Sequence, residues 1–169
     1  MAWMDTVAER EVARDRLKLG DYIGESIIIV LTALVALFFV DNQMQETGFF
    51  TSDFGAVEMA LFYGSLLYGM VPPVLRMIGG RRNAVRPFEV LGNVIFIVAA
   101  VYLLYVFPFD MSHLTDLFPS SLKFILDWMT DDIAKLLFAF AAIVSMLAAV
   151  WTAFLYVVVR RRLARAPPA

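Results

Sequence analysis

The sequence predicts an all-α integral membrane protein: a bundle of four transmembrane helices, with a short extracytoplasmic interfacial helix between the third and the fourth. Three observations predict this fold. Hydrophobic residues make up 61% and charged residues 18% of the 169-residue chain, whereas a soluble globule is near half apolar and about a quarter charged. The apolar residues gather in four blocks, each close to the roughly 20 residues that cross the hydrocarbon core of a bilayer. Basic residues lie mainly on one side of these blocks.

The four blocks predict the limits of the spans within a single membrane domain that covers residues 1–169. The spans are expected at about residues 22–40, 57–78, 88–109 and 131–159. The first block has the length of a signal peptide, but the segment before it mixes acids with bases and no A-x-A-like cleavage site follows it. We therefore expect the first block to be retained as a membrane span.

Local signals predict where some of these helices begin or bend. Gly20 followed by Asp21 predicts a stop and then the N-cap of the first span. Pro72 and Pro73 remove two backbone N–H groups inside the second span, which predicts a kink. Thr130 is a suitable N-cap for the fourth span, and the acids that follow it complement the helix dipole.

The distribution of basic residues predicts the orientation of the chain. Twelve of the fourteen Lys and Arg residues precede the first span, lie at the end of the second span or in the loop after it, or follow the fourth span, while Lys123 and Lys135 lie on the other side. Cytoplasmic segments of membrane proteins carry the basic excess. We therefore expect a multi-pass protein of the cell membrane, the plasma membrane, with its N-terminus and C-terminus both in the cytoplasm.

The connection between the third and fourth spans contains one further predicted helix. Leu122, Ile125, Leu126 and Met129 recur at the spacing of one helix face. This pattern predicts a short helix over residues 120–129 that lies on the outer surface of the bilayer or caps the bundle.

Six residues of the predicted spans are candidates for a ligand or ion site. They combine an acid, the proline pair and polar side chains at similar depth: Glu25, Tyr68, Pro72, Pro73, Asn93 and Tyr156. The prolines deprive two carbonyls of their helical partners, and ionisable groups inside membrane spans are functional candidates. The structural alternative, which we favour, is that Glu25 lies close to the membrane boundary and pairs with Arg76 or Arg160.

A stripe of small residues on the fourth span predicts a helix-packing interface. Ala141, Ser145, Ala149 and Ala153 recur at every fourth position, and small residues let membrane helices approach closely. We favour packing within the four-helix bundle. Self-association, or contact with a membrane-protein partner, is the alternative.

Two further polar sets lie on the predicted outer side. Asp110, His113 and Asp116 recur at three-residue spacing, so on a helix they would share one face and offer a divalent metal a weak site. Acids are common in such loops, and we expect no metal there. Glu58 and Lys135 are expected to form an interfacial ion pair of little energetic weight.

Composition and motifs exclude several functions. The chain has no cysteine and one histidine, which excludes disulfides, thiol catalysis and multi-histidine metal sites. The phosphate-binding, dinucleotide-binding, hydrolase and metalloprotease motifs are all missing from the sequence. We therefore expect no catalytic residues and no cofactor. The short basic clusters beside the spans suit membrane lipids with anionic headgroups, and we expect no nucleic-acid partner.

Three functions remain in consideration. The first, which we favour, is a non-enzymatic helix bundle that acts by self-association or as an accessory subunit of a membrane complex. The second is an oligomeric channel or transporter module for an ion or small solute, which the uncharged middles of the first and third spans do not favour. The third is a membrane enzyme that acts on lipids.

Overall fold

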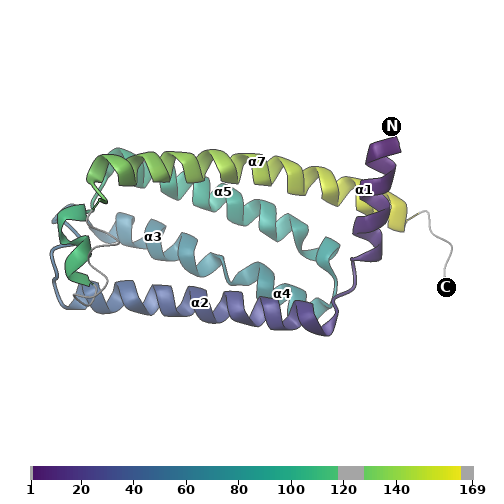
Figure 1. Cartoon of the computed structure of the whole chain (residues 1–169), viewed down its shortest axis with the longest axis horizontal. Helices are drawn as coiled ribbons and strands as arrows, with labels where there is room; N and C mark the ends of the chain where they lie inside the picture. The colour runs from purple at the N-terminus through teal and green to yellow at the C-terminus, as the bar shows by residue number, and fades with distance from the viewer. Residues whose placement is uncertain (1, 118–127, 165–169) are drawn as a thin grey trace.

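The computed structural model describes residues 2–117 and 128–164, which form helices joined by loops (Figure 1). The elements, in chain order, are α1 (Ala2–Ala13), α2 (Leu19–Met44), α3 (Ala56–Tyr68), α4 (Val71–Gly79), α5 (Arg82–Val106), the 3-10 helix η1 (Met111–Leu117) and α7 (Asp131–Leu163). The predicted interfacial helix at residues 120–129 lies almost wholly outside the described residues.

The prediction of four helices able to cross a membrane is confirmed. Leu19–Met44, Ala56–Gly79, Arg82–Val106 and Asp131–Leu163 are each long and apolar enough to do so. The second of these is interrupted at the proline pair, as the sequence predicts, because α3 ends at Tyr68 and α4 begins at Val71. Two tighter hydrogen bonds, from Gly69 N to Leu66 O and from Met70 N to Leu67 O, close the end of α3.

The third helix lies earlier in the chain than the predicted span of residues 88–109. It begins at Arg82 because the N-terminal segment supplies acceptors for its first amides: Arg82 N donates to Asp15 O at 2.8 Å and Asn83 N to Asp15 Oδ1 at 2.8 Å. It ends at Val106 because Phe107 takes a left-handed conformation, with φ of 42°, and Pro108 follows.

The predicted N-caps have different outcomes. Thr130 caps α7, its hydroxyl accepting from Ile133 N at 3.4 Å. The prediction for Asp21 is wrong, because α2 begins at Leu19 with Lys18 as its N-cap. Asp21 lies in the first turn of the helix, where its carboxylate accepts from Lys18 N at 2.8 Å and favours the helix start through the dipole.

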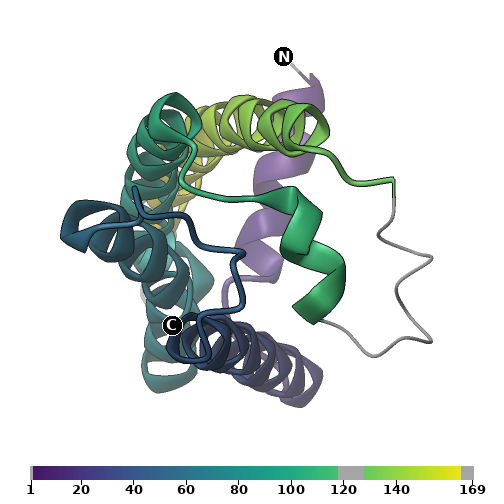
Figure 2. The same ribbon diagram turned by 90° about the vertical axis from the view of Figure 1, so that its left-hand side faces the viewer.

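The four long helices form an open bundle. α5 packs most extensively along α7 and also contacts α3 and α4, while α2 contacts α3 and α4. α2 and α7 do not pack along each other, so the bundle is open on the side between them (Figures 1 and 2). α1 lies across one end of the bundle, against α7. We call this end, where both termini lie, the terminal end, and the opposite end the distal end.

Aromatic side chains form the core of the distal end. The buried rings of Phe49, Phe54 and Phe109 are joined by rings from three helices, namely Phe39, Phe62 and Phe138. Phe109 lies within 5.8 Å, centroid to centroid, of Phe49, Phe62 and Phe138. Backbone bonds tie the same loops together, with Thr51 N donating to Pro108 O and Asp110 N to Phe49 O.

The predicted ion pair between Glu58 and Lys135 is wrong. The buried Glu58 carboxylate accepts from the Tyr102 hydroxyl at 2.9 Å and from Gly55 N at 3.0 Å, at the N-terminus of α3. Lys135 Nζ lies 4.6 Å from the centroid of the Phe107 ring. Glu58 therefore bonds Tyr102, and Lys135 contacts Phe107, because the rotation of the helices and the turn at Phe107 bring these groups together.

Polar contacts stabilise the terminal end, and we predict that Asp15 anchors the start of α5. Asp15 is 6% exposed, and Asp15→Ala would leave the buried Asn83 N–H without its acceptor. We expect a loss of stability of about 1–2 kcal/mol and faster hydrogen exchange at the Asn83 amide, measured by mass spectrometry. Asp41→Ala, which removes an exposed acceptor for Gln45, is the control. Unchanged exchange at Asn83 would show that Asp15 is not an anchor.

Candidate functional site

A half-buried arginine joins three helices near the terminal end. Arg76 of α4 donates from Nε to Glu25 Oε1 and from Nη2 to Glu25 Oε2, both at 2.7 Å, and from Nη1 to Glu89 Oε1. Glu25 lies on α2 and Glu89 on α5. The three side chains are 16% (Arg76), 10% (Glu25) and 24% (Glu89) exposed. We call this set the Arg76 cluster.

Local structure explains why Arg76 lies where it does. The helix restarts at Val71, with the proline pair in its first turn, and ends before Gly80, whose φ of 62° gives a left-handed C-cap. Arg76 is therefore in the last turn of α4, where the unpaired carbonyls favour a cation. A guanidinium can bind one carboxylate with two parallel hydrogen bonds and still reach another acceptor, and Arg76 does both.

The cluster has an excess of negative charge. With all three groups ionised, one guanidinium faces two carboxylates, which gives a net charge of −1. Arg82 and Arg86 lie close by in the chain but pair with Asp21 and Glu11. Buried charge is costly unless it is paired, so the second carboxylate of the cluster is the group that would gain most from a further cation.

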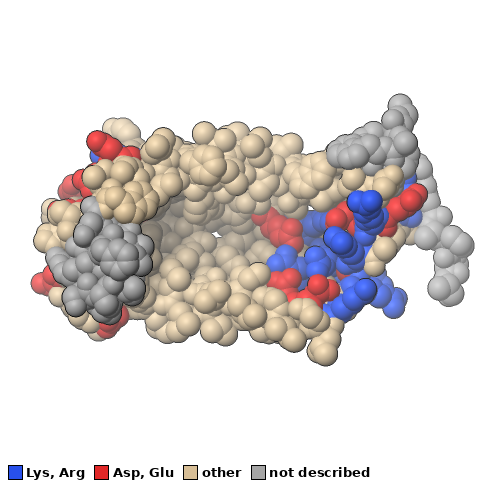
Figure 3. Space-filling view, viewed as in Figure 1, with Lys and Arg blue, Asp and Glu red and all other residues tan. Residues whose placement is uncertain are grey.

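Two neighbouring cavities lie on the inner side of this cluster, and the smaller one reaches it. The smaller, of about 320 Å³, is lined by Arg76, Glu89 and Asn93 together with the proline pair and its neighbours. The larger, of about 510 Å³, is apolar and is lined by residues of α2, α3, α5 and α7. They share Ser65, Gly69 and Phe96. In the space-filling view the surface is hollowed between α7 and α2, and the hollow ends at charged side chains (Figure 3). We call the two cavities together the α2–α7 groove.

The helix break leaves two carbonyl groups beside the groove. Pro72 and Pro73 have no N–H to donate to the carbonyls of Tyr68 and Gly69, which they would meet in an unbroken helix. Within the described residues no hydrogen bond reaches either oxygen. Ser65 donates to its own helix, at Phe62 O. This part of the groove wall therefore offers acceptors that need donors.

The structure brings together five of the six residues that the sequence singles out. Tyr68, Pro72, Pro73 and Asn93 line the smaller cavity, and Glu25 joins it through Arg76. Tyr68 Oη donates to Phe88 O at 3.2 Å, and Asn93 Nδ2 donates to Glu89 O at 3.0 Å.

Tyr156 lies apart from this group, on the last part of α7. Its hydroxyl accepts from Arg160 at 2.8 Å, so Arg160 is not the partner of Glu25.

Glu89 is the residue that the sequence analysis missed. It follows Pro87 at the start of a predicted span, where an acid is readily taken for a boundary residue. One signal was present: Glu89 and Asn93 are four residues apart and thus share a helix face.

The small-residue stripe lies on the helix that has the most extensive neighbour. Ala141, Ser145, Ala149 and Ala153 are all half-buried, and α7 packs along α5. Ala141 also lines the apolar part of the groove. The stripe is therefore partly covered by the bundle itself, and its distal end reaches the open side.

The weak metal candidates are only partly described. His113 Nε2 lies 4.0 Å from Asp110 Oδ2, while the Asp116 side chain is outside the described part of the structure. Hydrogen bonds from the Ser112 hydroxyl and backbone, helped by His113, lower the pKa of Asp110. Among the described residues, no three His, Cys, Asp or Glu side chains are grouped to hold a metal ion.

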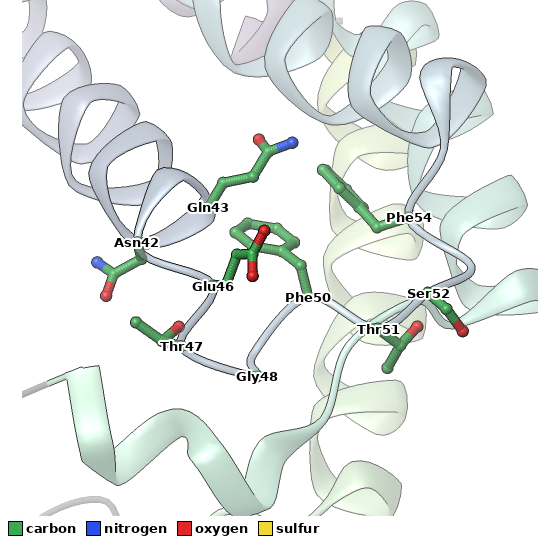
Figure 4. Close-up of a pocket in the computed structure, with 9 residues that line it drawn as sticks. All are labelled: Asn42, Gln43, Glu46, Thr47, Gly48, Phe50, Thr51, Ser52 and Phe54. Carbon is green, nitrogen blue, oxygen red and sulfur yellow. The ribbon is translucent and has the colours of Figure 1, made fainter.

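A separate polar pocket lies in the loop after α2 (Figure 4). It measures about 330 Å³ and is lined by residues of the segment from Asn42 to Phe54. Glu46 and Gly48 have positive φ values of 50° and 88°, and Thr47 Oγ1 is buried without a hydrogen-bond partner among the described residues. Its one charged side chain, Glu46, is exposed, so this pocket has a weaker claim to charged-ligand recognition than the Arg76 cluster.

The Arg76 cluster and the α2–α7 groove are the geometry from which a function is inferred. They combine a guanidinium shared by two carboxylates, two carbonyls that accept no hydrogen bond within the described residues, and an apolar cavity. Compared with protein-family models, with curated proteins and with solved structures, the chain matches none.

Proposed function

We propose that this chain is a multi-pass protein of the cell membrane with both termini in the cytoplasm, and that it acts without catalysis by binding another membrane-spanning helix. The helix belongs to an accessory partner or to a second copy. Four apolar helices of sufficient length support the membrane location. The gathering of Lys and Arg at the terminal end supports the orientation (Figure 3).

The open side between α2 and α7 is the observation that carries this proposal. In a closed bundle α2 and α7 would pack against each other, and each would bury the inward face of the other. Here they do not pack together, and an apolar cavity of about 510 Å³ lies between the helices. Membrane interiors are densely packed by helix or lipid, so another molecule fills this space in a bilayer.

The residues that line the groove favour a helix over lipid chains. Its wall includes five small residues: Ser65, Gly69, Ala99, Ala100 and Ala141. Small residues bring helix backbones close enough for van der Waals contact and are typical of interfaces between membrane helices. The outer surfaces of α2 and α7 carry large side chains instead, such as Leu37 and Leu147, which are 63% and 66% exposed.

Transport has weaker support. Polar groups of the groove lie near the terminal end, whereas the rings of Phe39, Phe62, Phe96 and Phe138 line its apolar part. A pore would need polar groups along its whole length.

The proposal predicts that filling the groove prevents association. Ala141→Trp places an indole on the groove wall, and overpacking of this kind costs about 1–3 kcal/mol, which corresponds to about 5-fold to 150-fold in affinity. We expect the fraction of complex seen by native mass spectrometry, after gentle extraction from the host membrane, to fall accordingly. Leu147→Trp, on the exposed face of the same helix, should leave the complex intact.

Two results would contradict this function. A wild-type chain that is monomeric and without a protein partner in its own membrane would remove it directly. Equal effects of Ala141→Trp and Leu147→Trp would show that any association uses a surface other than the groove.

A further inference from the structure

The groove contains more hydrogen-bond acceptors than donors at its terminal end. Arg76 uses its guanidinium on Glu25 and on one oxygen of Glu89. Within the described residues no hydrogen bond reaches Glu89 Oε2 or the carbonyl oxygens of Tyr68 and Gly69. A bound group that pairs with these acceptors must therefore donate hydrogen bonds.

The same place has a negative charge that a ligand can reach. Glu89 lines the smaller cavity, and its side chain is 24% exposed. The Glu25 side chain is 10% exposed, and both of its carboxylate oxygens accept hydrogen bonds from the Arg76 guanidinium. Because Arg76 neutralises one carboxylate, the remaining charge is most accessible at Glu89. A cation that enters from the groove would meet Glu89 first.

We propose that the helix bound in the groove carries a lysine or arginine that pairs with Glu89 and donates to the carbonyls beside the proline pair. This inference rests on the proposed function and names the chemistry of the partner. The basic side chain lies at the level of Glu89, near the cytoplasmic boundary, and the rest of the helix is apolar and packs on the small residues of the larger cavity. Charged groups within spans pair with one another in this way.

The competing occupant with the same chemistry is a lipid with an amine headgroup. A cavity of about 510 Å³ lies in the range of small-ligand sites, so size alone does not distinguish the two. The small residues of the groove wall distinguish them. Alanine and glycine let a helix backbone approach closely, whereas lipid chains pack equally well against leucine.

The test uses synthetic spanning peptides as the probe. The full chain, labelled at Ser52→Cys in the exposed loop, is reconstituted in phosphatidylcholine vesicles; the natural chain has no cysteine to compete for the label. Labelled Leu–Ala peptides of about 24 residues carry Lys, Gln or Glu one turn inside one end. Binding is measured by energy transfer. We expect the Lys peptide to bind about tenfold more tightly than the Gln peptide, and the Glu peptide to bind least.

Variants of Glu89 make the test specific. Glu89→Gln should abolish the preference for Lys, while Glu89→Asp, which keeps the charge, should retain it. Circular dichroism is the check that both variants fold. Asp21→Asn, which removes a charge from the Arg82 pair outside the groove, should leave the preference unchanged.

The outcomes separate this inference from the function on which it rests. Equal binding of all peptides, blocked by Ala141→Trp, would keep helix association and overturn the basic partner. A preference for Lys that survives Glu89→Gln would overturn the pairing with Glu89. Loss of the preference when phosphatidylethanolamine is added, with that lipid retained in native mass spectra, would assign the site to a lipid amine. No peptide binding, together with a monomer in the native membrane, would remove both proposals.

Discussion

Replacing Arg76 with leucine should lower the free energy of unfolding by about 3–5 kcal/mol, because it leaves the buried Glu25 carboxylate and the half-buried Glu89 carboxylate without their shared cation. The wild-type guanidinium makes hydrogen bonds to both Glu25 and Glu89 and connects α2, α4 and α5 through them. Removal of one partner from a buried ion pair is far more costly than removal of the whole pair. The measurement is unfolding in mixed detergent micelles, followed by circular dichroism.

Two matched variants test the reason for this effect. Arg82→Leu removes an ion pair to Asp21 whose side chains are 39% and 28% exposed, and it should cost less than about 1 kcal/mol. Adding Glu25→Gln and Glu89→Gln to Arg76→Leu should recover most of the lost stability, since no buried charge remains. A triple variant no more stable than Arg76→Leu would show that Arg76 acts through packing of its stem.

Replacing Phe109 with alanine is the second change with a large expected effect. Phe109 is 3% exposed and lies among rings from α3, α7 and the loop after α2. Truncation of a buried phenylalanine removes apolar contact and leaves a cavity, at a cost of about 3–5 kcal/mol. We expect this loss in the same unfolding assay, with faster hydrogen exchange at Thr51 and Asp110, whose amides bond across the two loops.

Tyr105→Ala is the control for Phe109→Ala. Tyr105 precedes Phe109 by four residues but is 89% exposed, and an exposed truncation should change stability by less than about 0.5 kcal/mol. Similar losses for both variants would mean that the aromatic core does not hold the distal end. Unchanged exchange at Thr51 and Asp110 would mean that Phe109 stabilises the helices but not the loops.

Features that depend on neighbouring residues could be predicted from the sequence. The four apolar helices follow from composition and length. The break at Pro72 and Pro73 follows from the missing N–H groups, and the cap at Thr130 from the reach of its own hydroxyl. None of these requires knowledge of any other helix.

Features that depend on how helices face one another could not be predicted in the same way. The sequence offered Arg76 and Arg160 equally as partners for Glu25; the rotation and depth of α4 and α7 selected Arg76, while Arg160 bonds Tyr156. The helix α5 begins at Arg82, earlier than predicted, because Asp15 of the distant N-terminal segment accepts hydrogen bonds from its first amides. Glu58 and Lys135 were predicted as a pair, but Tyr102 and Phe107 lie closer to them.

The chain alone thus determined the four long apolar helices and the break in the second of them, because length, composition and proline act within a few residues. Only the tertiary structure decided that α2 and α7 stay apart, that Glu89 shares Arg76 with Glu25, and that small residues from α3, α5 and α7 line one groove. The physical reason is that apolar helices of similar composition can pack in several rotations and orders. The arrangement is selected by contacts between residues far apart in the chain.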